Sequence, residues 1–199
     1  KLVNQKRLYL VLLVILGLGI LLGLLYPFFL SLDNQDLLNT SITSFFNNVM
    51  NQKLDYATGL QNSLVSNFSF LIGIWLLGIS VIGLPIIALL LLLKGFVFGF
   101  SISAIISVYH WKGILGAITY VFPSNILFLI TTLLLVFYAI SFSLKLFRYL
   151  FLKENLNFKQ IMNKYLKILG ICLVSYLIVS LLDVYFQPFF MKLFTFFLK

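Results

Sequence analysis

Acidic residues, histidine and cysteine are all scarce in this sequence. Its 199 residues include 5 Asp and Glu, 1 His and 1 Cys. One histidine and one cysteine cannot supply the usual nitrogen and sulfur ligands of a zinc ion, and one cysteine cannot form a disulfide within the chain. No phosphate loop of the GxxxxGK[ST] kind occurs either. We therefore expect neither an enzyme nor a bound cofactor or metal.

Apolar side chains, in contrast, make up 62% of the sequence, while charged ones make up 10%. A membrane-spanning helix needs about 20 mainly apolar residues. The alternation of polar and apolar residues that a membrane β-barrel requires does not occur. The sequence therefore predicts an all-α, polytopic membrane helix bundle that forms a single domain over residues 1–199. Five spans are expected, at residues 8–30, 68–93, 95–109, 114–144 and 168–190.

Most basic residues lie beside these apolar runs. The chain has 14 Lys and Arg and a formal net charge of +9. Next to membrane spans, such charges favour anionic lipid headgroups as partners, so we expect membrane lipids and no nucleic acid. With the N-terminus inside, ten of the 14 fall on the cytoplasmic side, including those of a basic segment at residues 145–167. This bias predicts a cytoplasmic N-terminus and an extracytoplasmic C-terminus.

The connection at residues 31–67 is polar, but its apolar side chains recur at helical spacing. This pattern predicts an amphipathic extracytoplasmic helix. Such a helix either lies on the membrane or on neighbouring spans, or offers a docking face to an extracytoplasmic partner. For the docking face, the candidate partner-binding residues are Phe45, Phe46, Met50 and Tyr56.

Small residues recur every four positions in two of the expected spans. Helices in lipid approach one another closely where such residues form a stripe. We expect these stripes to pack within the chain or in a homodimer. The candidate helix-packing residues are Gly19, Gly23, Gly95, Gly99, Ser103 and Ser107.

Prolines and polar residues interrupt the apolar runs. A proline inside a span removes a backbone donor and kinks or breaks the helix. Broken helices form solute or ion sites in transporters, whereas ordinary kinks are held by neighbouring helices. We expect Lys94 at the inner interface; a turn at Gly83 to Pro85 would instead place it in the middle of the membrane. The candidate residues of this class are Pro85, Lys94, Pro123, Asn125 and Asp183.

Several stretches between Trp75 and Arg148 occur in an order that resembles the stage II sporulation protein M family. They are WLLGISVIGLP, LKGFVFGF, WKG, FPSN and SFSLKLFR. The first span and the outer connection agree with the family only in layout.

This resemblance implies a bacterial cell-membrane protein of endospore formation that performs no catalysis itself. It implies a scaffold that holds sporulation proteins D and P, which process peptidoglycan, at the septal or engulfing membrane. Cell-wall remodelling there accompanies engulfment of the forespore. The alternatives are a transporter or the membrane subunit of an ATP-driven exporter, and a lipid-handling or purely structural membrane protein.

Overall fold

The computed structural model describes residues 5–50, 55–120, 124–151, 153, 157–190 and 192, without the side chains of residues 32, 49, 50 and 120. Every regular element in this part of the chain is a helix. The long helices are α1 (Gln5–Leu25), α2 (Leu32–Met50), α3 (Tyr56–Ile79), α4 (Gly83–Tyr120), α5 (Ile126–Phe151) and α6 (Phe158–Leu181). A short 3-10 turn, η1 (Tyr26–Phe29), follows α1, and a π-helical turn, η3 (Leu182–Phe186), follows α6.

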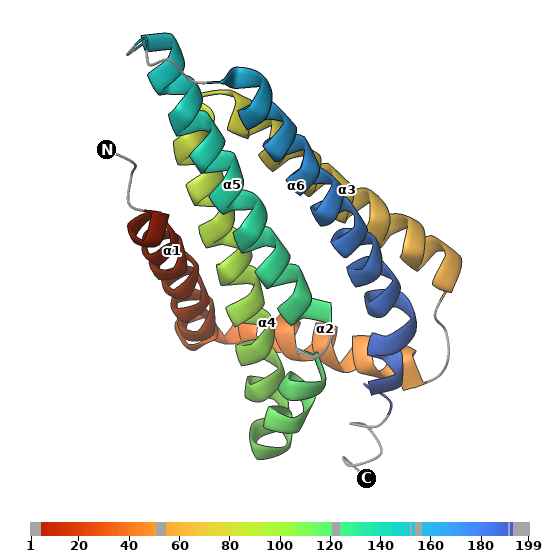
Figure 1. Ribbon diagram of the computed structural model, residues 1–199. Coiled ribbons are helices and arrows are strands. Elements are labelled where there is room, and N and C mark those ends of the chain that lie inside the picture. The colour runs from red at the N-terminus through yellow and green to blue at the C-terminus, as the bar shows by residue number, and fades with distance from the viewer. Residues whose placement is uncertain are drawn as a thin grey trace.

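Within the described residues, five segments are long and apolar enough to cross a membrane. They are Gln5–Phe29, Tyr56–Ile79, Gly83–Thr119, Ile126–Phe151 and Phe158–Phe190. The five-span helix bundle predicted from the sequence is therefore confirmed, with shifted boundaries. Figure 1 shows α1, α3, α4, α5 and α6 running along the bundle, while α2 lies across one end. The N-terminus and the C-terminus lie at opposite ends of the bundle (Figure 1).

The turn between α3 and α4 differs from the expected position. The second span was expected to end at residue 93, but the chain already turns at residues 80–82, where the Gly83 amide donates to the Ser80 carbonyl at 3.1 Å. A methyl group on Gly83 would overlap the Leu77 carbonyl oxygen, so this tight turn requires glycine. Pro85 follows in the first turn of α4, where its missing amide hydrogen costs no helical hydrogen bond.

A second reversal interrupts α4 at His110. This residue has φ 49° and ψ −127°, which are not helical values. After it the chain folds back, and a methyl group on Gly113 would lie 2.7 Å from the Ile105 carbonyl oxygen. The interruption agrees with the turn expected between residues 109 and 114. The part of α4 that crosses the bundle therefore ends near Tyr109.

The start of α3 also differs from the expectation. The second span was expected from residue 68, with residues 31–67 outside the membrane, but α3 begins at Tyr56. Asp55 caps this helix, because its side chain accepts hydrogen bonds from the amides of Ala57 and Thr58. The cap allows the polar residues that follow to join the helix. The separate outer element is therefore α2 alone.

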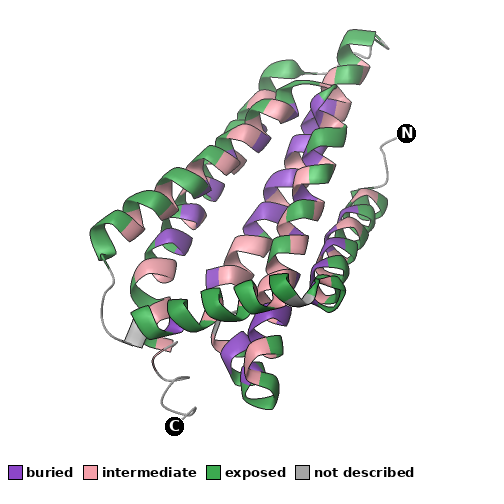
Figure 2. Ribbon diagram, turned by 180° about the vertical axis from the view of Figure 1, so that it is seen from behind, coloured by how far each residue is buried: buried purple, intermediate pink, exposed green. Residues whose placement is uncertain are grey.

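Buried residues lie on the sides of the helices that face the middle of the bundle, and exposed residues lie on the outer sides (Figure 2). At the end where α3 turns into α4, Tyr165 of α6 stacks between Phe142 and Trp75, with ring centroids 4.4 Å and 5.8 Å away. Its hydroxyl donates to the Trp75 carbonyl at 2.9 Å. Close to it, the Ser143 hydroxyl donates to the Ser80 carbonyl at 3.1 Å. These contacts join α3, α5 and α6 to the α3–α4 turn.

Candidate functional site

The outer helix α2 has one face against the bundle and one open face. Phe46 is 3% exposed and packs edge-on against Tyr109 of α4, with ring centroids 5.3 Å apart. Ile42 and Leu38, one and two turns earlier on the same side, are partly buried. Together these side chains hold α2 across the end of the bundle.

The open face of α2 is polar. Its exposed residues include Asn39, Thr40, Asn47 and Asn48. The Thr40 hydroxyl donates to the Asp36 carbonyl at 2.9 Å, so its hydrogen bond lies within α2. Two large apolar side chains interrupt this polarity, Phe45 at 49% and Leu37 at 66% exposure. An amphipathic helix that still exposes apolar side chains after packing on its own bundle retains surface for a partner.

The four predicted partner-binding residues do not form one patch. Phe45 and Phe46 touch, with ring centroids 5.8 Å apart, but only Phe45 reaches the surface. Tyr56 belongs to α3 and stacks on Tyr185 beyond α6, with ring centroids 5.9 Å apart and an interplanar angle of 2°. The side chain of Met50 lies outside the described residues. Among the described side chains of α2, the accessible apolar contact is therefore formed by Phe45 and Leu37.

The predicted small-residue stripes meet each other. A methyl group on Gly19 or Gly23 of α1 would overlap the backbone of α4 at Leu92 or Phe96. In return, a methyl group on Gly95 would lie 2.6 Å from the Leu16 carbonyl oxygen, and one on Gly99 would overlap the backbone of Ile20. At these contacts the residue numbers increase in the same direction along both helices, so α1 and α4 run parallel. The pair is the most closely packed in the bundle and forms within one chain.

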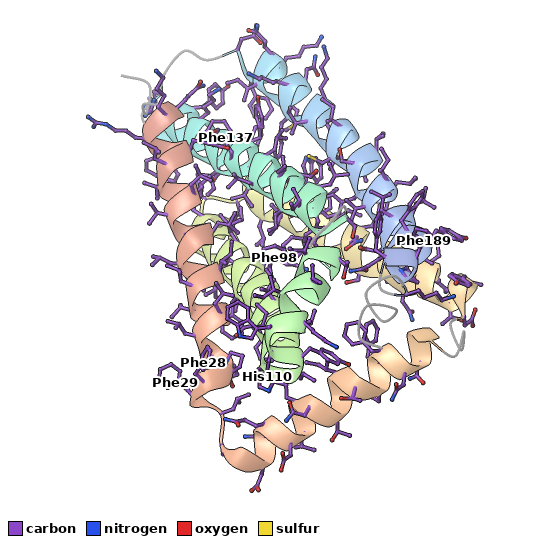
Figure 3. The ribbon with its side chains drawn as sticks, turned by 90° about the horizontal axis from the view of Figure 1, so that it is seen from below. Phe28, Phe29, Phe98, His110, Phe137 and Phe189 are labelled. Atoms are coloured by element: carbon purple, nitrogen blue, oxygen red, sulfur yellow. The ribbon has the colours of Figure 1, made fainter. Side chains whose placement is uncertain are left out.

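Serines continue this stripe towards α2. The Ser103 hydroxyl donates to the Leu24 carbonyl of α1 at 2.7 Å. Ser107 instead donates to the Ala104 carbonyl of its own helix at 2.8 Å. It lines an apolar cavity of about 540 Å³ together with His110 and Phe28. Figure 3 shows Phe28, Phe29 and His110 at this end of the bundle, beside α2.

Lys94 lies inside the bundle and not at the expected inner interface. Because α4 begins at Gly83, Lys94 is in the fourth turn of the helix, roughly 16 Å along its axis. This is about half the thickness of the hydrocarbon core. Its Nζ lies 4.3 Å from the ring centroid of Phe70 and 4.9 Å from that of Phe128. The faces of the two rings attract the ammonium group and stabilise it away from water.

Further polar side chains, which we call the polar series, are buried on α3, α5 and α6. Asn67 of α3 is 9% exposed, and its Nδ2 donates to the hydroxyl oxygen of Ser180 at 2.9 Å. The hydroxyls of Thr132 and Tyr176 are hydrogen-bonded at 2.8 Å, and the Tyr176 ring packs on Phe128. These interhelical hydrogen bonds satisfy buried polar atoms and link α3, α5 and α6.

Asp183 lies at the outer end of this polar series. It is partly buried in the π-helical turn η3, and the Ser124 hydroxyl is directed towards its carboxylate without reaching hydrogen-bonding geometry. Asn125 is partly buried immediately before α5. Pro123 lies outside the described residues. Lys94, the polar series and Asp183 together place polar groups on α3, α4, α5 and α6 and in η3.

Sequence reasoning missed this polar series. Asn67 was assigned to the outer connection, and Thr132 and Tyr176 were counted among the residues of apolar spans. The available signal was polarity at single positions within long apolar runs. Within the described residues, no group of three or more His, Cys, Asp or Glu side chains is placed to hold a metal ion.

The chain was compared with protein families, curated proteins and solved structures. The family model described as Stage II sporulation protein M matches residues 11–188. No curated protein and no solved structure matches the chain.

Proposed function

Because the chain belongs to the stage II sporulation protein M family, we propose that it is a non-catalytic membrane scaffold for engulfment in endospore formation. In this proposal it anchors peptidoglycan-processing enzymes, sporulation proteins D and P, at the septal membrane. Family membership supports a sporulation-related membrane protein, and the arrangement of α2 favours the scaffold role.

The single observation that carries the proposal is the position of α2. This helix lies across the end of the bundle, packs through Phe46 and keeps a polar face with Phe45 and Leu37 exposed. A surface of this kind suits a protein partner that works outside the membrane. The rigid bundle beneath it would hold that partner at a fixed height above the lipid.

The distribution of charge supports an extracytoplasmic position for α2. Basic residues gather at the opposite end of the bundle, where the chain begins and α5 leads to α6. Positive charge beside short connections favours the cytoplasmic side. Eight described basic residues belong to that end and two, Lys112 and Lys192, to the end with α2; the eight are Lys6, Arg7, Lys145, Arg148, Lys153, Lys159, Lys164 and Lys167.

The proposal is tested by co-purification from sporulating cells in mild detergent, with mass spectrometry of the recovered proteins. Wild-type protein should recover peptidoglycan hydrolases, and Phe45→Ser with Leu37→Ser should recover much less. Phe151→Ser is the matched control, because Phe151 is 67% exposed at the opposite end of the bundle. Equal recovery by wild type and the α2 variant would contradict the proposal.

A second candidate function is transport, either alone or as the membrane subunit of an ATP-driven exporter. The observation that favours it is Lys94, an ionisable side chain inside the bundle, together with buried polar groups on neighbouring helices. Protein reconstituted in liposomes would then conduct protons, as reported by an enclosed pH-sensitive dye, and Lys94→Met would abolish the flux. Absence of flux in wild type, together with recovery of hydrolases, would favour the scaffold.

A further inference from the structure

The basic end of the bundle contains a cavity that the scaffold function does not use. Its volume is about 850 Å³, and it lies between α5 and α6 beside the start of α1. Figure 3 shows Phe137, one of its lining residues, on α5 next to the start of α1. Its lysines lie in the last turns of α5 and the first turns of α6, at the end of the bundle that we expect to face cytoplasmic lipid headgroups.

Four lysines line this cavity: Lys145, Lys159, Lys164 and Lys167. None of them forms an ion pair with a described residue, and no acidic side chain is among the residues that line the cavity. Four like charges around one space repel each other unless an anion or solvent compensates them. The cavity therefore favours a ligand with several negative charges.

The remaining walls supply both hydrogen-bonding and apolar groups. Asn157, Gln160 and Asn163 of α6 line one side, and Gln5 of α1 lines another. The Asn157 side chain also accepts from the Gln160 amide at 3.2 Å, which fixes it at the start of α6. These amides can donate hydrogen bonds to phosphate oxygens.

The apolar part of the cavity is aromatic. Phe137, Tyr138 and Phe142 of α5 belong to it. Lys164 Nζ lies 5.5 Å from the Tyr138 ring centroid, so the ring stabilises the ammonium group at the wall. Aromatic walls beside ammonium groups suit an amphiphile whose phosphates contact lysine while its glycerol and acyl carbons contact the rings.

We propose that this cavity binds the phosphate headgroup of an anionic phospholipid, preferentially one with two phosphates. Four lysines around one cavity match two phosphates better than one. Basic pockets between membrane helices bind such headgroups by the same electrostatic attraction. The shared chemistry, phosphate on a lysine cluster, is also available from a soluble polyphosphate, so the experiment includes both sources.

The experiment titrates purified protein in neutral detergent with cardiolipin, phosphatidylglycerol, phosphatidylcholine or sodium pyrophosphate and follows the shift in melting temperature. The test variant is Lys145→Gln with Lys164→Gln. The matched control, Lys6→Gln with Lys153→Gln, removes the same charge at the same end but from residues that do not line the cavity. The variant Lys145→Arg with Lys164→Arg keeps the positive charge but changes the shape of the side chains. It therefore distinguishes the effect of charge on binding from the effect of packing.

Cardiolipin should stabilise the wild type at lower concentration than the other lipids. The test variant should bind it about thirtyfold more weakly, because two lysine contacts to phosphate are lost. The control and the arginine variant should bind within about threefold of wild type, because the cavity keeps its charge. Equal weakening in the test and control variants would overturn the proposal. So would stabilisation by pyrophosphate without any stabilisation by anionic lipid.

Discussion

Gly19 of α1 lies so close to Leu92 of α4 that a methyl group on the glycine would overlap the leucine carbonyl oxygen. Gly99 of α4 approaches the backbone of Ile20 in the same way from the other side. Two helices that each place a GxxxG face on the other pack backbone against backbone. In lipid, where the hydrophobic effect does not hold helices together, this contact is a main source of their association.

Gly19→Val should therefore separate α1 from α4 and lower the stability of the bundle by about 2 kcal/mol, as overpacking does elsewhere. The measurement is the melting temperature in detergent, followed by size-exclusion chromatography. Gly17→Val is the control, because a methyl group at Gly17 meets nothing within 4 Å. Equal losses in the two variants would show that the close approach of the helices is not what stabilises them.

Phe46→Ala should loosen α2 from the bundle. The substitution removes a buried ring that packs on Tyr109, and truncations of this kind cost about 3 kcal/mol in a packed core. Amides of α2 should then exchange with deuterium faster, while those of α5 keep their protection. Phe45→Ala, at a half-exposed neighbour, should leave the exchange of α2 nearly unchanged; faster exchange in this control than in Phe46→Ala would contradict the packing described.

Lys94→Met should retain or raise stability, because methionine fills the space between Phe70 and Phe128 without a charge that must be kept from water. Lys94→Glu should be strongly destabilising, since the electron-rich ring faces repel a carboxylate. Melting temperatures in the same detergent compare the two variants. A larger loss for methionine than for glutamate would contradict an apolar aromatic environment around Lys94 and would indicate a hydrated one.

The cap at Asp55 predicts a pH dependence for the start of α3. The hydroxyl and amide of Thr58 hold the pKa of Asp55 below its ordinary value of 3.8. The unfolded chain therefore binds a proton more readily than the folded one. The stabilisation is complete above that value and is lost as the pH falls through the lower folded pKa.

Amide protection in the first turn of α3, corrected for intrinsic exchange, should fall between about pH 4 and about pH 2 in wild type. It should depend much less on pH in Asp55→Asn, whose side chain can still accept from the helix but does not titrate. The same loss in both proteins would assign the pH dependence to another group.

The sequence predicted the number of spans and the interhelical stripes because both depend on local pattern. About 20 apolar residues indicate a span, and glycines four apart mark one helix face. The α3–α4 turn was expected near Lys94, because residues 68–93 form one apolar run in the sequence and a lysine at its end is typical of a membrane interface. Its aromatic neighbours, Phe70 and Phe128, come from other helices, which periodicity in one segment cannot identify.

The same limit applies to α2. Its amphipathic pattern predicted a helix with one apolar face, but two adjacent phenylalanines were both placed on the docking surface. The structure buries Phe46 against Tyr109 and leaves Phe45 half exposed. Which of the two phenylalanines packs depends on where the part of α4 that crosses the bundle ends. The reversal at His110 fixes that position.

We propose that the open face of α2 holds peptidoglycan-processing enzymes outside the membrane. The most direct test of this proposal is a photo-crosslinking amino acid at position 45 in sporulating cells, with one at position 151 as the control for the opposite end. If α2 holds these enzymes, position 45 should crosslink to a peptidoglycan hydrolase and position 151 should not. Crosslinks from position 45 to lipid alone, or the same hydrolase captured from both positions, would contradict it.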